Sequence, residues 1–264
     1  MAEPYLAVQK GLKCGTCHVS PSGGGMRTAY GNLYAQTELA ARTWKMGDLW
    51  TGEVGKYLAV GGNLRASYQE IDVPGQPSTS ADGLDEFLAY VEIRPFPKYL
   101  SLYVDARLRP DDPVIREQYA RVSLPGGRWS VRAGEFFLPY GLRLQDDEAF
   151  IRQVSGINFN TPDNGWEVGY EGGPWSAQAA VTRGTAGGPE TDSGKQYSLR
   201  VSHVKTTWRA GASFNFNDAR IGDRQMQNVF AGLVTGPVAW LAEIDYIVDD
   251  STPTGRRKSW ATLI

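Results

Sequence analysis

From Glu53 onward the sequence alternates between apolar and polar residues with a period of two. In Trp208–Phe216, for example, every second residue is Trp, Ala or Phe, and the residues between them are Arg, Gly, Ser and Asn. A period of two places one kind of side chain on each face of a β-strand. Most of these segments have 8 to 11 residues, which suffices for a tilted strand to cross a membrane. We predict about twelve strands, near residues 54–69, 85–94, 99–109, 115–124, 129–138, 164–171, 175–183, 196–204, 208–216, 226–234, 238–248 and 258–264.

The connections between these segments alternate between short and long. Short turns on one side and long loops on the other are typical of bacterial outer-membrane barrels. A soluble β-sandwich, the alternative, does not predict this alternation. The predicted short connections are 95–98, 125–128, 172–174, 205–207 and 235–237, and the long ones are 71–84, 110–114, 139–163, 184–195, 217–225 and 249–257.

Aromatic residues stand near the starts of the predicted strands. On a barrel they would form two girdles, one at each membrane interface, whereas in a sandwich they would lie in the core. Tyr99, Trp129, Trp175, Trp208 and Trp240 follow short turns, and Trp166, Tyr197 and Trp260 follow long loops. The prediction is therefore an all-β transmembrane antiparallel β-barrel of about twelve or more strands.

The overall composition agrees with a barrel and excludes some other classes. The sequence contains no run of 18 apolar residues, so we predict no transmembrane helix. The mean hydropathy of −0.37 does not exclude a barrel, because only alternate residues of its strands face lipid. A net charge of −2 gives no basic footprint for nucleic acid, so we expect membrane lipid and no nucleic acid among the partners.

The polar faces of the predicted strands carry charges of both signs, which indicates a wet interior without strong selectivity for one ion. The longest predicted loop, 139–163, contains Arg143, Asp146, Asp147, Glu148 and Arg152. It could fold inward as a constriction or remain a solvated surface loop.

The residues on the polar faces of the predicted strands are expected to point into the barrel. They are Glu86, Tyr90, Glu92, Arg94, Asp105, Arg107, Glu117, Tyr119, Arg121, Arg132, Arg200, Arg209, Glu243 and Asp245.

Both cysteines of the chain lie in Cys14-Gly15-Thr16-Cys17-His18. The pattern C-x-x-C-H indicates attachment of a c-type haem. The Cys14 and Cys17 thiols would bind one haem c as thioethers, and His18 would be the proximal iron ligand. Attachment of this kind takes place outside the cytoplasm, so it implies export. A zinc site needs four ligands, a thioredoxin-type pair needs a βαβ context, and a disulfide would leave His18 unexplained.

Three residues are candidates for the sixth iron ligand: Met26, Met46 and His203. Met26 is the nearest and is favoured over Met46. It would also open an amphipathic helix, so the alternative is that Met26 only packs, with the sixth position open or otherwise filled. His203 has the parity of lipid-facing residues and is expected at the interface. The predicted helix places on one face Met26, Tyr30, Leu33, Tyr34, Thr37 and Ala41.

Two parts of the chain are predicted, a haem-binding segment over 1–45 and the barrel over 46–264. The first strand precedes a long loop and therefore runs outward, which places the haem segment on the periplasmic side or in the barrel lumen. The N-terminal residues lack the pattern of a signal peptide. The chain stops at Thr262-Leu263-Ile264 without a terminal aromatic, so we expect a C-terminally truncated barrel.

The order of C-x-x-C-H and then a barrel resembles the fused monohaem cytochrome–porins of the outer membrane. In iron(II)-oxidising bacteria that class takes electrons from extracellular ferrous iron. The resemblance implies an electron carrier more than an enzyme with a separate substrate-converting step. Its partners would be periplasmic c-type cytochromes on one side and an extracellular metal ion, mineral or outer cytochrome on the other.

A second, shorter resemblance lies in Val131–Leu144, where Gly134, Phe136, Pro139 and Gly141 are similar to the phosphate-selective porin O/P type. It supports a barrel more than a substrate. The alternatives to electron transfer are a diffusion porin whose haem segment is a plug or a docking site for cytochromes, and a porin sheath around partner cytochromes.

Overall fold

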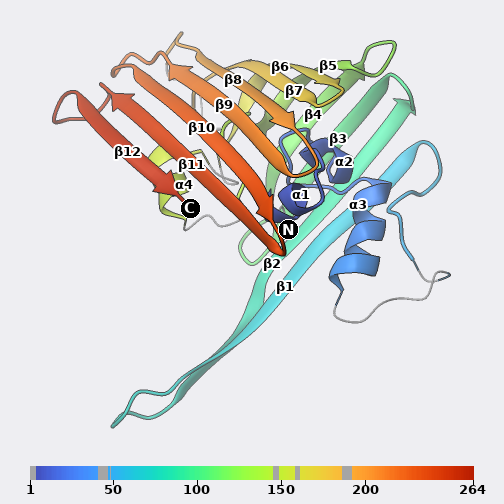
Figure 1. Cartoon of the computed structure of the whole chain (residues 1–264). Helices are drawn as coiled ribbons and strands as arrows, with labels where there is room; N and C mark the ends of the chain where they lie inside the picture. The colour runs from blue at the N-terminus through green and yellow to red at the C-terminus, as the bar shows by residue number, and fades with distance from the viewer. Residues whose placement is uncertain (1–3, 41–46, 48, 145–148, 158–160, 186–191) are drawn as a thin grey trace.

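The computed structural model describes residues 4–40, 47, 49–144, 149–157, 161–185 and 192–264. Twelve strands form one curved antiparallel sheet in which each strand pairs with its neighbours in the sequence (Figure 1). No pairing between β1 and β12 is found in these residues. The strands are β1 (Leu58–Ile71), β2 (Thr79–Phe96), β3 (Leu100–Arg109), β4 (Val114–Ser123), β5 (Trp129–Phe137), β6 (Pro162–Gly172), β7 (Trp175–Thr182), β8 (Gln196–Val204), β9 (Trp208–Asn217), β10 (Arg224–Thr235), β11 (Val238–Asp249) and β12 (Arg257–Leu263).

The sheet is inverted relative to a soluble protein, with polar side chains inside and apolar ones outside. Asp105, Glu117 and Glu243 are fully buried on the concave side, whereas Leu199 and Ile244 are exposed on the convex side. A convex apolar surface around a polar interior is what a barrel in lipid requires. The predicted fold class is confirmed: the chain is all-β, antiparallel and has the fold of an outer-membrane β-barrel protein.

The aromatic residues that were predicted to form girdles point outward, and their place at the membrane interfaces stays a prediction. All eight, from Tyr99 to Trp260, are exposed on the convex surface. His203 lies beside two of these aromatic residues, and its position at the membrane interface stays a prediction. Its ring stacks on Trp208 at 5.1 Å and meets the edge of Trp175 at 4.6 Å between centroids.

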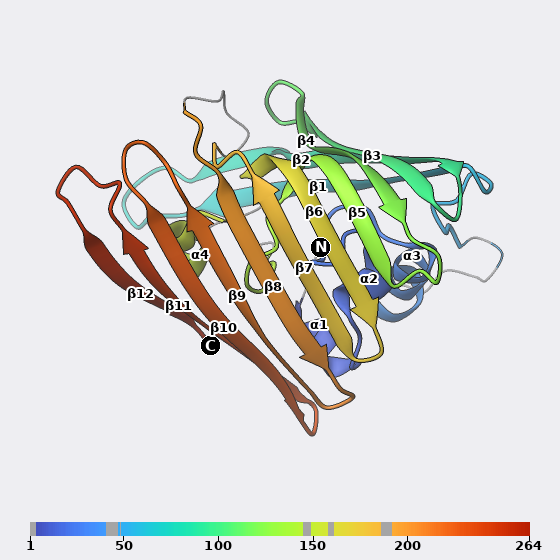
Figure 2. The same ribbon diagram turned by 90° about the horizontal axis from the view of Figure 1, so that it is seen from above.

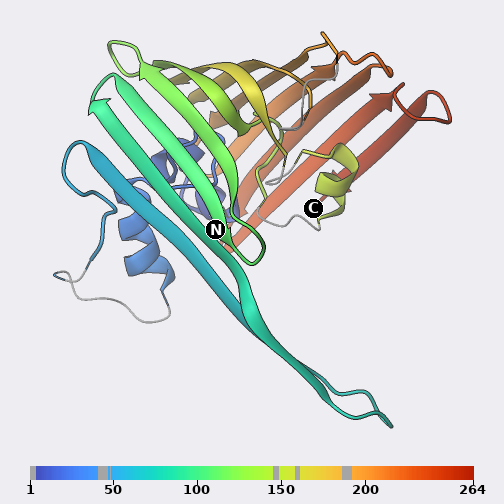
Figure 3. The same ribbon diagram turned by 180° about the vertical axis from the view of Figure 1, so that it is seen from behind.

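The prediction of a loop over residues 71–84 is wrong. Strands β1 and β2 stay paired as far as Ile71 and Thr79, and their hairpin projects well beyond the other strands (Figure 3). Both faces of this projection are exposed and largely polar. A strand without a buried face shows no period-two pattern, which is why the sequence did not reveal it.

The long loop after β5 folds inward across the lumen, which decides between the two alternatives. Its backbone is bonded to the opposite wall, where Gly141 N–H donates to the Ser213 hydroxyl at 2.9 Å. The Tyr140 hydroxyl donates to Asp245 at 3.2 Å. Helix α4 (Phe150–Ser155) carries Arg152, which pairs with the buried Glu243. Asp146, Asp147 and Glu148 lie outside the described residues.

The N-terminal segment lies on the concave side of the sheet, at the end with the short turns (Figure 2). It contains α1 (Pro4–Gln9), α2 (Cys14–Cys17), α3 (Ala29–Tyr34) and a π-helical turn, η1 (Ala35–Leu39). Helix α1 packs on β10 and β11. Lys13 reaches Glu171 at 2.7 Å, beside the short turn between β6 and β7. Among the described residues, no helix is long and apolar enough to span a bilayer.

The predicted helix from Met26 to Ala41 needs correction. The helix begins at Ala29, because Thr28 is its N-cap and accepts a hydrogen bond from Gly31 N–H at 3.1 Å. Met26 precedes the helix in a bend, where its carbonyl accepts a hydrogen bond from Val19 N–H at 3.0 Å. Ala41 and the predicted boundary at 45/46 lie outside the described residues.

Candidate functional site

The two cysteines occupy a single helical turn, α2, which brings residues three apart to the same side. His18 ends this turn, and its N–H donates to the Cys14 carbonyl at 3.0 Å. Thr28, at the far end of the loop that follows, holds the turn in place. Its N–H donates a hydrogen bond to the Cys17 carbonyl at 2.9 Å, and its hydroxyl donates one to the Thr16 carbonyl at 2.8 Å. The local fold therefore presents two thiols and one imidazole together.

Helix α3 rests directly on this turn. A Cβ at Gly31 would lie 2.1 Å from the Cys17 carbonyl oxygen, so only glycine permits the contact. The loop between the two helices is anchored to the barrel wall, since Met26 N–H donates to the Tyr103 hydroxyl at 3.0 Å. The site is thus fixed both within the segment and against the wall.

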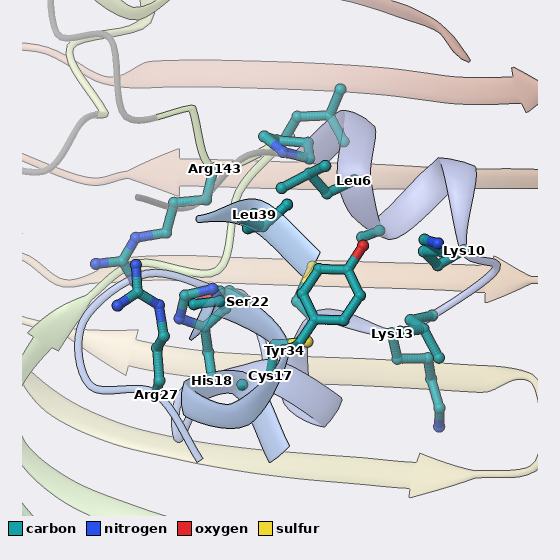
Figure 4. A pocket seen from close by; sticks show the side chains of 18 of the residues that line it. Leu6, Lys10, Lys13, Cys17, His18, Ser22, Arg27, Tyr34, Leu39 and Arg143 are labelled. Carbon is teal, nitrogen blue, oxygen red and sulfur yellow. The ribbon is translucent and has the colours of Figure 1, made fainter. Parts of the chain in front are cut away.

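Both thiols and the imidazole line a cavity of about 750 Å³, a volume that includes space open to solvent. Leu6, Leu12, Leu39 and Leu142 give it apolar walls (Figure 4). The segment provides most of the lining, and the barrel adds Leu142, Arg143 and Arg200.

His18 is held as a neutral imidazole. Burial and the nearby guanidinium group of Arg27 lower its pKa to about 3. Its Nδ1 is buried and makes no hydrogen bond within the described part of the chain. A neutral imidazole is the form that binds a metal ion.

The two thiols differ in their ionisation. Burial opposes ionisation of Cys14, but Arg209 and Arg200 outweigh it, so the pKa of this thiol lies below its usual value. The Arg209 Nη2 donates to the Cys14 Sγ at 3.7 Å. Burial and the neighbouring Cys14 raise the pKa of the Cys17 thiol. Both cysteines are free, so they form no disulfide with one another.

The cavity lining is strongly cationic. Five of its residues carry a positive charge and none carries a carboxylate. Lys13 is paired with Glu171, and Arg143 lies 3.9 Å from Glu117. The other three cations, Lys10, Arg27 and Arg200, form no ion pair in the regions that the structure describes.

The candidates for a sixth ligand have different surroundings. Met26 is buried in a cluster with Val19, Tyr90 and Tyr103 and does not line the cavity. Its position favours the packing role, and its ligation of iron stays a prediction. His203 lies on the convex face, and Met46 lies outside the described residues. No group of three or more His, Cys, Asp or Glu side chains converges on a metal position in the described ranges.

Sequence analysis did not find the cavity residues beyond the C-x-x-C-H pattern. Arg200 was placed inside the barrel, but nothing linked it to Cys14. Leu6, Leu39 and Leu142 are ordinary apolar residues of three separate segments. Only the inward fold of the loop and the segment brings them together, so no local signal could have identified them.

Comparisons with known proteins give no family. No family model matches the chain, and no curated protein matches it. The resemblances to cytochrome–porins and to phosphate-selective porins therefore stay predictions. Among solved structures, the chain is similar to a loop L8 deletion mutant of OmpT, an outer membrane protein of Vibrio cholerae. The two share 12% identity over 78% of this chain and 86% of that chain, with a TM-score of 0.42.

Proposed function

We propose that this chain is an outer-membrane electron carrier that holds one covalent haem c inside its barrel. The observation that carries the proposal is the cavity in which both thiols of C-x-x-C-H and the His18 imidazole face one apolar space. When bound, the haem would supply one-electron redox chemistry. The protein would supply attachment, orientation and shelter from water.

Each residue of the motif has a definite task in this proposal. Cys14 and Cys17 anchor the porphyrin through thioethers, and His18 binds the iron with its neutral ring. The leucine side chains exclude water from the apolar faces of the porphyrin. The anchored loop and Gly31 keep the imidazole and the thiols in a fixed relation.

The position of the cavity suggests how electrons enter and leave. Short turns of outer-membrane barrels face the periplasm, and the N-terminal segment lies at the end with the short turns. Periplasmic c-type cytochromes are therefore the partners on this side. On the other side the inward loop fills the lumen with Phe137, Tyr140 and Leu142. We infer that an extracellular metal ion such as ferrous iron, a mineral or an outer cytochrome exchanges electrons with the haem across these buried side chains.

The test is to produce the chain with a bacterial c-type haem maturation system and to solubilise it in detergent. We expect a haem-stained band on a denaturing gel and a c-type α-band in the reduced visible spectrum. The C14A/C17A variant should lose both signals, and H203A, the matched histidine control, should keep them. A parent chain without covalent haem would refute the proposal. Electron transfer alone would be refuted if ferrous iron and reduced cytochromes failed to reduce the oxidised protein and if oxidised cytochromes and oxidised minerals failed to reoxidise the reduced protein.

A second function is favoured by the filled lumen. The segment and the inward loop both bond to the barrel wall, as a plug does in a diffusion porin. In that case solute conductance across a planar bilayer would rise when the segment is deleted and would not depend on the redox state of the haem. Conductance that stays negligible after deletion would exclude the porin.

A further inference from the structure

The cation-rich wall of the cavity favours a ligand that carries negative charge. Arg200 is only 2% exposed. Its Nε donates to the Gly141 carbonyl at 2.9 Å, and its guanidinium lies 5.0 Å from the centre of the Phe230 ring. It forms no ion pair within the described part of the chain. Glu243 and Glu171 influence it only from beyond ion-pair distance. A buried cation without a direct counter-charge is unfavourable, so we expect an anion to bind at this wall.

Arg143 and Arg27 extend this cationic wall. Arg143 is held over the Phe137 ring at 4.2 Å, on the loop that Arg200 bonds. The backbone of Arg27 pairs with that of His18 in an isolated antiparallel β-bridge. The Arg27 side chain makes no hydrogen bond or ion pair in the described ranges. In Figure 4 the side chains of Arg27 and Arg143 point toward one another beside His18, away from Lys10 and Lys13.

Thioether attachment removes the negative charge that Cys14 could offer to the arginines beside it. The Cys14 thiol, when ionised, would face Arg209 and Arg200. In thioether formation the S–H bond adds across a vinyl double bond. The sulfur forms a bond to one carbon, the hydrogen atom is transferred to the other carbon, and no group leaves. The sulfur can then no longer ionise, and the arginines keep no counter-charge from the segment.

We propose that Arg27, Arg143 and Arg200 form a carboxylate-binding wall that takes the two carboxylates of the tetrapyrrole. This inference rests on the proposed function and adds to it. Two of the three arginines belong to the barrel and one to the segment. The ligand therefore joins the two parts, and its binding fixes the segment in the lumen.

The test uses an iron-free probe, so that it is independent of iron coordination. The full-length C14S/C17S chain in detergent is titrated with protoporphyrin IX, which has two carboxylates, and with its dimethyl ester, and tryptophan quenching is followed. We expect the diacid to bind at least 10-fold tighter than the ester. Each of R27Q, R143Q and R200Q should reduce that preference about 10-fold, the effect of one charge-assisted hydrogen bond. K10Q, which removes a cation from the other end of the cavity, should keep it.

The outcomes separate the two proposals. An equal affinity for diacid and ester, or a preference that survives in all three arginine variants, would overturn the wall. Absence of covalent haem in the matured parent chain would instead overturn the proposed function. R27Q is the variant least expected to misfold, because the Arg27 side chain makes no hydrogen bond or ion pair with the residues that the structure describes. If the cysteine-free chain binds neither porphyrin, the matured protein decides. Its midpoint potential should fall in R27Q and R200Q relative to K10Q, and equal potentials would overturn the wall.

Discussion

A buried ion pair is among the contacts that hold the inward loop across the lumen, and breaking it should lower the stability of the protein. Arg152 of α4 pairs with Glu243 of β11, and their side chains are 2% and 0% exposed. Replacing Arg152 with alanine leaves the Glu243 carboxylate buried without its cation. Among the described residues, two other donors remain on this carboxylate: the Asn228 amide at 2.7 Å and Leu142 N–H at 3.3 Å.

The expected cost follows from burial. Removing one partner of a buried ion pair costs about 3–5 kcal/mol, mainly because the other charge stays uncompensated. The two remaining donors place the R152A variant toward the lower end of this range. The matched control is R256A, whose partner Asp250 lies at 3.6 Å with side chains 65% and 41% exposed. An exposed pair of this kind contributes about 0–1 kcal/mol.

The assay is urea unfolding from lipid vesicles, followed by tryptophan fluorescence. Chymotrypsin cleavage after the exposed Phe150 reports release of the loop. R152A should lower the unfolding free energy and speed the cleavage, and R256A should do neither. The R152M/E243Q variant, which removes both charges, should recover most of the loss. If R152A behaves like R256A, or if the double variant is worse than R152A, the loop is not held by this pair.

Three further outcomes are expected. G31A should destabilise the chain by about 1–3 kcal/mol through its clash with the Cys17 carbonyl, and it should lower the yield of attached haem. G83A, with open space around it, should have neither effect. Equal haem yields in the two variants would refute the packing of Gly31 on Cys17. G11A should expose the N-terminal segment to protease, because Gly11 has φ +62° and touches the backbone of the β8–β9 turn; continued protection would contradict this docking. In the haem-free chain His18 has a pKa of about 3, below the 6.5 of the unfolded chain. The unfolded state therefore binds the proton first, and stability should fall as the pH drops from 6.5 toward 3. H18N should show a shallower fall, and parallel curves would argue against a buried neutral imidazole.

Much of the fold could be predicted from local patterns. The alternation in β8 or β9 reports which face is buried, because successive side chains of a strand point to opposite sides. The outward direction of the eight aromatic residues and of His203 follows from the same parity. The projecting part of β1 and β2 could not be predicted, since neither of its faces is buried. The helix start at Ala29 was missed because the cap at Thr28 outweighs the apolar spacing of Met26.

The C-x-x-C-H pattern is local as well, since two thiols and an imidazole within five residues need no partner from elsewhere to be recognised. By itself the sequence therefore determined the strands, their inward and outward faces, and the candidate attachment residues Cys14, Cys17 and His18. Only the tertiary structure decided that the loop after β5 crosses the lumen and that Arg143 and Arg200 meet Cys14 and His18 in one cavity. The reason is physical: these contacts join residues that are far apart in the sequence, and they depend on how the sheet curves, which no short pattern encodes.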